Sequence, residues 1–326
     1  MPPKQDCANE KSAVNKPFRE LFLFTGWWVT AFSLFCSFVI HASAFESDPT
    51  ESEWLVNHSV FECRLSHDIP YFGDAVFFQK AGESQVFFVS GYTPRFKSGK
   101  ASLRSKAPVW KKNGVDKDLG FISVRENKRP IHLNNQMSER ILAELRNGMD
   151  VFVERRPWYG SDESLEAGIR AVNFRAAYDG YLRCVAGLLP VNFEQIERSA
   201  IYFGSGKEAL LPSEVRKLDN IGTYFKADRS VKTFYVDGHS DGAGSRADNL
   251  VLSQERAEMV VKFLIARGIP SDSIVTRWHG ERYPVASNQT RKGRSQNRRV
   301  TIRLSREAAE RPTEKLMEDD DQVASR

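Results

Sequence analysis

The sequence is poor in the residues that mark metal sites and hydrolases. It has six histidines and four cysteines in 326 residues, and they form no H-E-x-x-H run or comparable zinc-binding spacing. His239 beside Asp241 resembles half of a catalytic dyad, but we expect no nucleophile to complete it. These shortages predict a protein that is not an enzyme and that binds neither a metal ion nor a cofactor.

Charge of one sign is also scarce. The formal net charge is only +5 at pH 7, which is small for a nucleic-acid binder, because such a protein has to neutralise many phosphates. The most basic stretch, residues 291–299, could contact nucleic acid or phospholipid, but we interpret it as a solvated loop. We therefore predict no nucleic-acid partner.

Long hydrophobic runs are absent except for one, Leu21–Ile40. Lys16 and Arg19 precede it, and residues 42–44 read A-S-A, so the segment has the basic flank, apolar stretch and cleavage signal typical of a secretory leader. We predict cleavage after Ala44 and export to the periplasm. The alternative is an uncleaved anchor, because about 20 apolar residues can span a bilayer.

Removal of residues 1–44 would leave two cysteines, Cys63 and Cys184. An even number of cysteines in an oxidising compartment predicts one disulfide between them. Two unpaired buried thiols are the alternative.

Residues 45–190 are predicted to form a mostly antiparallel β domain, because short apolar and aromatic runs alternate there with turn residues. One helix is expected to interrupt the strands, over Ser138–Asn147, with Ser138 as its cap and Gly148 as its stop. Trp158 and Tyr159 could be partner contacts, but we favour a place in the core. The expected strands include residues 86–92, 119–124 and 149–156.

Residues 191–304 are predicted to form a second domain of β-α-β-α-β-β order, an α/β sandwich with helices on one face of a mixed sheet. Pro212 is expected to open the first helix, and Ser253 is expected to cap the second one. The charged tail, residues 305–326, is predicted to be disordered. The chain as a whole is thus predicted to be α+β. The expected strands of this domain are residues 200–203, 231–236, 274–278 and 299–304.

A carboxylate and a guanidinium stand close together in this second domain. Asp241 lies in a glycine-rich loop, and Arg256 is expected in the first turn of the helix that follows. A carboxylate can bind an ammonium while a guanidinium forks onto a carboxylate, so the pair fits an amino-acid-like zwitterion. The alternative is a surface ion pair. Gly238, Gly242 and Gly244 would let the backbone approach the ligand.

Several ordered motifs carry a resemblance to the OmpA-like peptidoglycan-binding domain. They are GHSD at 238–241, Asn249, LSQERA at 252–257, GIP at 268–270, GERYP at 280–284 and NRRV at 297–300. The resemblance implies that Asp241 and Arg256 grip the diaminopimelate of the stem peptide, with Asn249 as a weaker third residue. Gly242 and Arg298 would belong to the pocket, although strand alternation points Arg298 and Arg299 to opposite faces.

The runs at 61–77 and 178–196 are similar to the MotY family of sodium-driven flagellar motor proteins. This resemblance implies a structural role in the T ring of the basal body, with MotX, basal-body rings and, indirectly, stator units as partners. It also implies that Cys63 and Cys184 correspond to the family's disulfide. The alternative function is a general periplasmic wall tether without a motor role.

Overall fold

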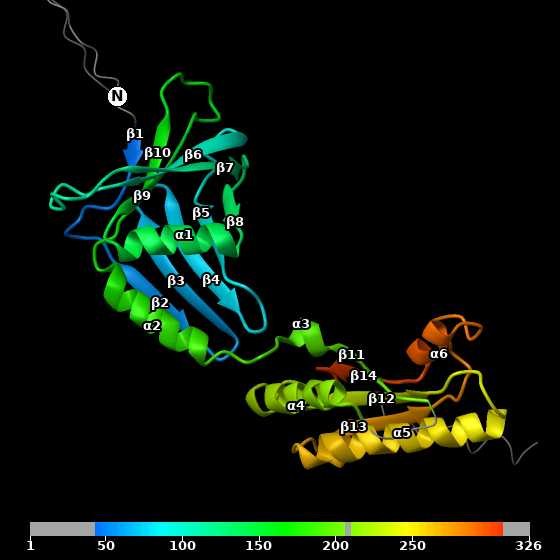
Figure 1. The fold of residues 1–326 in the computed structure, drawn as a ribbon. Helices are drawn as coiled ribbons and strands as arrows, with labels where there is room; N and C mark the ends of the chain where they lie inside the picture. Colours follow the sequence, from blue (N-terminus) through cyan, green and yellow to red (C-terminus); the bar gives the residue numbers. More distant parts are fainter. Residues whose placement is uncertain (1–42, 206–209, 309–326) are drawn as a thin grey trace, which may run out of the picture. The chain divides into compact units, whose positions relative to one another are not determined.

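The computed structural model describes residues 43–205 and 210–308 (Figure 1). These residues carry two hydrophobic cores, one built from residues 54–181 and one from residues 196–304. The predicted α+β class is confirmed. Residues 1–42 of the expected leader and residues 309–326 of the expected tail lie outside the described residues.

The first domain is built on one ten-stranded sheet. Its strand order is β1-β10-β9-β6-β7-β8-β5-β4-β3-β2, and every neighbouring pair is antiparallel except β1 and β10. The mostly antiparallel prediction is therefore confirmed. The expected cleavage point after Ala44 falls within β1. The strands are β1 (Ser43–Phe45), β2 (Trp54–His58), β3 (Glu62–Ile69), β4 (Gly73–Lys80), β5 (Val86–Gly91), β6 (Gly99–Lys106), β7 (Lys117–Val124), β8 (Ile131–Leu133), β9 (Asp150–Arg155) and β10 (Leu165–Ile169).

The helix α1 (Asn135–Arg146) begins earlier than predicted. Its cap is Asn134, whose side-chain oxygen accepts a hydrogen bond from the backbone N–H of Met137 at 3.2 Å. Ser138, the predicted cap, is instead fully buried inside the helix and donates its hydroxyl to the carbonyl of Asn134. The prediction failed because Asn134 and Ser138 are both good capping residues and only the packing decides between them.

A second helix in this domain, α2 (Phe174–Ala186), was not predicted. Phe174, Tyr178 and Tyr181 recur on one side of it, and their rings stack in sequence along the helix. This i, i+4, i+7 spacing is a helical signal. Both α1 and α2 pack against strands of the sheet, α1 on β5 and β9 and α2 on β2 and β3 (Figure 1).

The predicted disulfide is confirmed. Cys63 on β3 is bonded to Cys184 on α2, with a Cα–Cα distance of 5.9 Å. The alternative of two unpaired thiols is therefore excluded. The bond ties α2 covalently to the sheet.

Trp158 and Tyr159 do not belong to the core as expected. Their side chains are 52% and 58% exposed, and the two rings pack edge to face on each other. They lie in the loop after β9, where the two rings pack on each other and not against the core.

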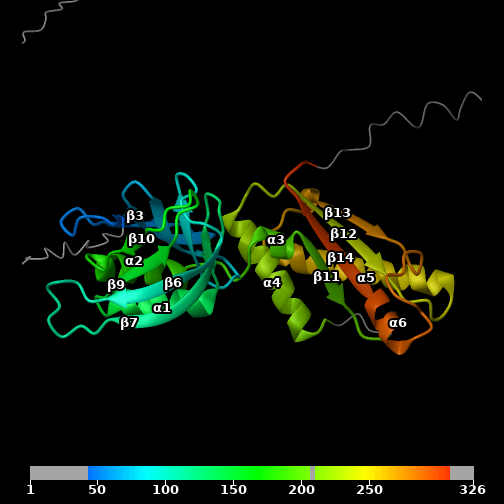
Figure 2. The same ribbon diagram turned by 90° about the horizontal axis from the view of Figure 1, so that it is seen from above.

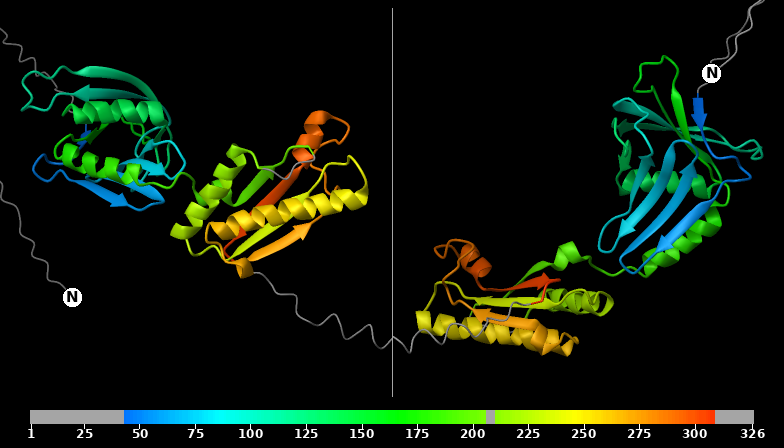
Figure 3. Two further views of the ribbon diagram at one scale, coloured as in Figure 1. Left: turned by 60° about the horizontal axis from the view of Figure 1, so that its bottom comes forward. Right: turned by 180° about the vertical axis from the view of Figure 1, so that it is seen from behind.

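The second domain has the predicted β-α-β-α-β-β order, with two short helices that were not predicted, one before the first strand and one between the last two. Its four strands lie in the order β11-β14-β12-β13, with β12 and β13 parallel and the other pairs antiparallel. The helices α4 and α5 cover one face of this mixed sheet (Figures 2 and 3). The elements are α3 (Phe193–Ile196), β11 (Arg198–Tyr202), α4 (Pro212–Ala227), β12 (Thr233–His239), α5 (Arg246–Ala266), the 3-10 turn η1 (Ser271–Ser273), β13 (Ile274–Trp278), α6 (Arg291–Asn297) and β14 (Arg299–Ser305).

The helix α5 starts well before the predicted cap, Ser253. Ser245 caps it by accepting a hydrogen bond from the backbone N–H of Asp248 at 3.1 Å. Ser253 lies inside the helix, fully buried, where its hydroxyl donates to the carbonyl of Leu250 and accepts from the backbone N–H of Gly280. The hydroxyl of either serine can accept a hydrogen bond from a backbone N–H. The local sequence therefore does not distinguish them, and the prediction of Ser253 as the cap was wrong.

The basic stretch 291–299 is not simply a loop, because residues 291–297 form α6 and Thr290 caps it by accepting from the backbone N–H of Gly293 at 3.0 Å. Within residues 43–205 and 210–308, no helix has both the length and the apolar character needed to cross a membrane. The run Leu21–Ile40, considered above as leader or anchor, lies outside that range.

Candidate binding site after strand β12

Asp241 lies in the loop that leaves the end of β12, as predicted. It is only 8% exposed, and its Oδ2 atom forms an ion pair with Nη1 of Arg298 at 2.8 Å. Its Oδ1 atom accepts a longer hydrogen bond, 3.3 Å, from the backbone N–H of Ala243. The carboxylate is therefore held on one side by a cation and more loosely on the other.

Arg298 connects Asp241 to a second segment of the domain. Its Nε atom donates to the carbonyl of Phe203 at 3.2 Å, and its own carbonyl accepts from the backbone N–H of Phe203 at 3.0 Å. Phe203 directly follows β11. Arg298 thus fixes the β12 loop and the end of β11 in one arrangement.

Arg256 does not lie in the first turn of a helix, because α5 begins at Arg246. Its side chain is fully buried, its Nη2 atom donates to the carbonyl of Gly204 at 3.2 Å, and its guanidinium lies 5.3 Å from the centre of the Phe203 ring. Arg256 and Arg298 therefore contact adjacent residues. The structure brings both cations and Asp241 together around Phe203 and Gly204.

Asn249 is buried, but its side chain contacts a different acidic residue. Its Nδ2 atom donates to Oε2 of Glu281 at 2.9 Å, and Glu281 also pairs with Arg246 at 3.5 Å. A cavity of about 260 Å³ lies beside these residues. Its lining consists of Arg246, Ala247, Leu250, His279, Gly280, Glu281 and Arg282.

The glycines differ in their roles. Gly242 donates its N–H to Oδ1 of Asn288 at 3.1 Å, so this donor is engaged by the protein itself. Gly238 is inside β12, and a Cβ there would lie 2.1 Å from the carbonyl oxygen of Ser253. Its role is therefore to let α5 approach the strand, not to approach a ligand as predicted. Gly244 has φ +90° and open space around it, which fits a loop position.

The structure separates the two neighbouring arginines that the sequence left undecided. Arg298 contacts Asp241, whereas Arg299 is buried and donates through Nη2 to the carbonyl of Tyr283 at 3.1 Å. Burial lowers the pKa of the Arg299 guanidinium. Arg299 therefore holds the chain near Tyr283 and is separate from the Asp241 cluster.

Sequence reasoning missed Asn297, which supports the loop from behind. It is fully buried, its Oδ1 atom accepts from the backbone N–H groups of Val285 and Ala286, and its Nδ2 atom donates to Asn288 at 2.7 Å. Because Asn288 holds the N–H of Gly242, Asn297 positions the loop indirectly. Its signal in the sequence is its place as the first residue of the NRRV motif at 297–300.

The run GHSDG at 238–242 has the G-x-S-x-G spacing of serine hydrolases, although no nucleophile was expected beside His239. Within the described part of the chain, however, neither the hydroxyl of Ser240 nor Nδ1 of His239 has a hydrogen-bond partner, so no serine–histidine pair is formed. Burial, then Arg299 and His279, lower the pKa of His239 to about 4. The described residues also contain no cluster of His, Cys, Asp or Glu that could hold a metal ion.

Both parts of the chain are similar to known proteins. Residues 45–190 match the MotY N-terminal domain and residues 202–298 match the OmpA family. The chain is 28% identical over 276 residues to the sodium-type flagellar protein MotY of Vibrio parahaemolyticus, covering 83% of this chain and 93% of that protein.

Two further matches concern the second domain. The peptidoglycan-binding protein ArfA of Mycobacterium tuberculosis is 37% identical over 102 residues, which is 31% of each chain. Among solved structures, the peptidoglycan-associated lipoprotein of Burkholderia pseudomallei is 24% identical, with a TM-score of 0.31, over 32% of this chain and 89% of that one.

Proposed function

We propose that this chain, in which a MotY N-terminal domain is followed by an OmpA-family domain, tethers the flagellar motor to peptidoglycan and catalyses no reaction. The similarity to a flagellar MotY over 83% of the chain supports the motor association. The similarity of the second domain to a peptidoglycan-binding protein supports wall attachment. The partners would be MotX and the basal-body rings of the T ring on one side, and the wall on the other.

The cluster of Asp241, Arg298 and Arg256 is the observation that carries the wall-binding proposal. Diaminopimelate offers an ammonium and a carboxylate on one carbon. The ammonium would bind Oδ1 of Asp241, whose contact with Ala243 is long. The carboxylate would bind the guanidinium of Arg256, which can fork onto two oxygens. Arg298 would hold the Asp241 carboxylate in place through their ion pair.

Sedimentation of the purified protein with peptidoglycan sacculi tests this site. Asp241→Ala and Arg256→Lys should weaken binding roughly 10- to 150-fold, the equivalent of losing about 1.5–3 kcal/mol of charge-assisted hydrogen bonding. Arg256→Lys keeps the buried positive charge and removes only the ability to form two parallel hydrogen bonds to a carboxylate. The folded state of each variant is checked by circular dichroism.

A matched pair of controls exists in the same domain. Arg267, directly after the C-terminal end of α5, pairs with Asp219 at 2.5 Å, and within the described residues no hydrogen bond or ion pair joins this pair to the β12 loop. Asp219→Ala and Arg267→Lys should therefore sediment like the native protein. Equal sedimentation of all five proteins would contradict the assignment, and release of muropeptides would contradict the non-enzymatic role.

A motility assay tests the association with the motor. Deletion of the gene should stop swimming while flagellar filaments remain on the cells. Normal swimming together with envelope defects would favour a general wall tether. The proposed export of the chain is tested separately, because N-terminal sequencing of the periplasmic protein should begin at Phe45.

A further inference from the structure

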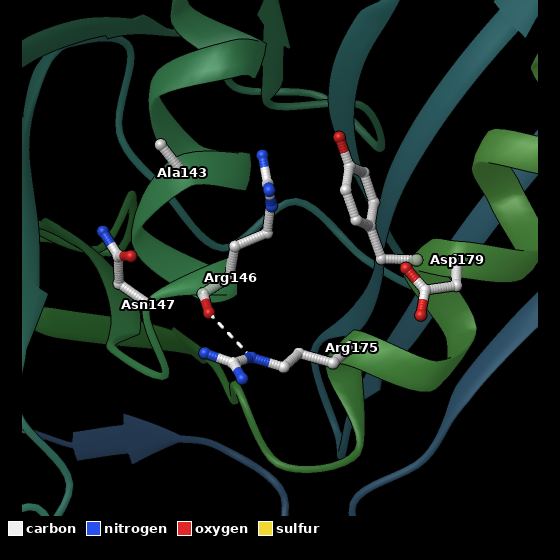
Figure 4. Close-up of a pocket in the computed structure, with 6 residues that line it drawn as sticks. Ala143, Arg146, Asn147, Arg175 and Asp179 are labelled. Carbon is white, nitrogen blue, oxygen red and sulfur yellow. Dashed lines mark hydrogen bonds between the residues drawn. The ribbon is translucent and has the colours of Figure 1, made fainter.

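A cavity of about 500 Å³ lies in the first domain, where the C-terminal end of α1 meets the N-terminal half of α2 (Figure 4). It is separate from the Asp241 cluster, which belongs to the second domain. Most of its lining is polar and two of the residues are arginines. The lining residues are Ala143, Arg146, Asn147, Arg175, Tyr178 and Asp179.

The two arginines are held close together by a direct contact. Arg175 on α2 donates its Nε–H to the backbone carbonyl of Arg146 at 3.1 Å, near the end of α1 (Figure 4). This bond fixes the plane of the Arg175 guanidinium, so less side-chain freedom is lost when its terminal NH₂ groups bind a ligand. The Arg146 guanidinium lies 5.5 Å from the centre of the Tyr178 ring, which restricts it as well.

The positive charge at this place is only partly neutralised by the described residues. Among the described residues, neither Arg146 nor Arg175 forms an ion pair, and Asp179 is the only acidic residue in the cavity lining. Lys111 adds a third cation nearby, since its ammonium donates to the carbonyl of Asn147. Neighbouring like charges repel each other, and an anion bound between them relieves that repulsion.

We propose that this cavity binds the side-chain carboxylates of an acidic segment of a protein partner. Two guanidinium groups match the planar shape of carboxylates and can each bind one of them bidentately. The Asn147 amide and the Tyr178 hydroxyl supply neutral hydrogen-bonding groups in the same lining. A volume of about 500 Å³ accommodates several side chains, and is larger than one small anion needs.

Fluorescence anisotropy with a labelled hexaglutamate peptide tests the proposal on the purified full-length protein. Unlabelled citrate and labelled hexalysine serve as comparison ligands. The double variant Arg146→Gln/Arg175→Gln should weaken hexaglutamate binding by roughly tenfold or more, because each charge-assisted pair is lost. Arg183→Gln is the matched control, because Arg183 is an exposed arginine of α2 outside the cavity lining. It should change binding less than twofold.

A variant that is expected to gain a new binding activity distinguishes a specific change of the cavity from misfolding of the domain. Arg146→Glu should lose hexaglutamate and acquire affinity for hexalysine, a change that an unfolded domain cannot produce. Equal losses in Arg183→Gln and the double variant would overturn the proposal by indicating non-specific charge attraction. Binding of citrate without hexaglutamate would also overturn it, in favour of a small-anion site.

The outcome is independent of wall binding. The cavity variants should sediment with sacculi like the native protein, whereas Asp241→Ala should bind hexaglutamate normally. Loss of sedimentation in the cavity variants would contradict the separation of the two sites.

Discussion

Each domain contains a buried arginine–aspartate pair with the same closest distance, yet the two pairs have different surroundings. Arg170–Asp150 in the first domain and Arg298–Asp241 in the second both measure 2.8 Å. Asp150 is 1% exposed, and its second oxygen accepts a short hydrogen bond, 2.7 Å, from the backbone N–H of Ala171. Among the residues that the structure describes, the second oxygen of Asp241 has only the longer bond to Ala243.

The pair in the first domain belongs to a saturated network. Arg170 also pairs with Glu46 at 2.8 Å and donates to the carbonyl of Ser47. His67 completes it, with its Nδ1 atom 2.9 Å from the carbonyl of Glu53 and its Nε2 atom near the backbone N–H of Arg170. Such a network holds distant segments together and leaves no room for a ligand. Saturation of the hydrogen-bonding groups, not the length of the ion pair, distinguishes this structural pair from the pair that we propose to take part in binding.

The largest loss of stability should come from removing Asp150, the carboxylate of the saturated Arg170–Asp150 pair. Asp150→Ala leaves the Arg170 cation with one remaining carboxylate and removes the partner of the Ala171 N–H. We expect the first domain to lose about 3–5 kcal/mol of unfolding free energy. Calorimetric unfolding measures this loss. Wall sedimentation should stay normal, and a variant as stable as the native protein would show that the network is dispensable.

The second domain should respond to acid through His239. Its pKa of about 4 in the folded state lies below the value near 6.5 of an unfolded histidine. As the pH falls from 6.5 to 4, His239 binds a proton in the unfolded chain but not in the folded domain. The free energy of unfolding therefore decreases by up to about 3 kcal/mol. Chemical unfolding at several pH values measures this loss.

His239→Gln is the matching control for the acid response, because glutamine does not titrate. The difference in stability between native protein and variant should shrink towards pH 4 and stay constant above pH 7. A difference independent of pH would refute the contribution of His239. Burial also lowers the pKa of His67, so His67→Gln should change the acid response of the first domain in the same direction.

A smaller effect is expected from loosening the pair at the candidate site. Arg298→Gln keeps a donor towards Phe203 but removes the charge beside Asp241. Wall binding should weaken several-fold, by about 1 kcal/mol, which is less than the loss in Asp241→Ala. Sedimentation at increasing protein concentration measures the shift. Stronger binding by Arg298→Gln would mean that Arg298 competes with the ligand for Asp241.

The smallest effect on stability is expected at an ion pair between β12 and β13 whose arginine is half exposed. Arg277 binds both oxygens of Asp237, at 2.6 Å and 3.0 Å, but half of its side chain is exposed to solvent. Arg277→Gln should cost less than about 1 kcal/mol, because surface ion pairs contribute little. Thermal unfolding in low and high salt measures it. A loss as large as that of Asp150→Ala would break the distinction between saturated and exposed pairs.

The sequence predicted those features that depend on local patterns. Alternating apolar residues predicted strands in both domains, among them β5, β7 and β9, and Pro212 marked the start of α4. The even number of cysteines after residue 44 predicted the disulfide. Helix starts were predicted less well, because Asn134 and Ser138, or Ser245 and Ser253, are equally good caps until burial decides between them.

The contacts of the candidate site were harder to predict. The loop position of Asp241 follows from the end of a strand, but its pairing with Arg298 joins segments that are distant in the chain. The role of Gly238 depends on how closely α5 approaches β12, which no local pattern contains. The cavity between α1 and α2 could not be predicted from the sequence either, because α2 itself was not predicted.

The disulfide has a mechanical consequence. Shortly after Cys184 the chain leaves the first domain, where the backbone N–H of Leu189 donates to the carbonyl of Val60 at 2.9 Å. Any pull that reaches this domain through its C-terminal end therefore meets a covalent bond almost at once. The load passes through Cys63 into β3, which is hydrogen-bonded to β2 and β4. Because of this bond, α2 cannot separate from the sheet before the sheet itself carries the force.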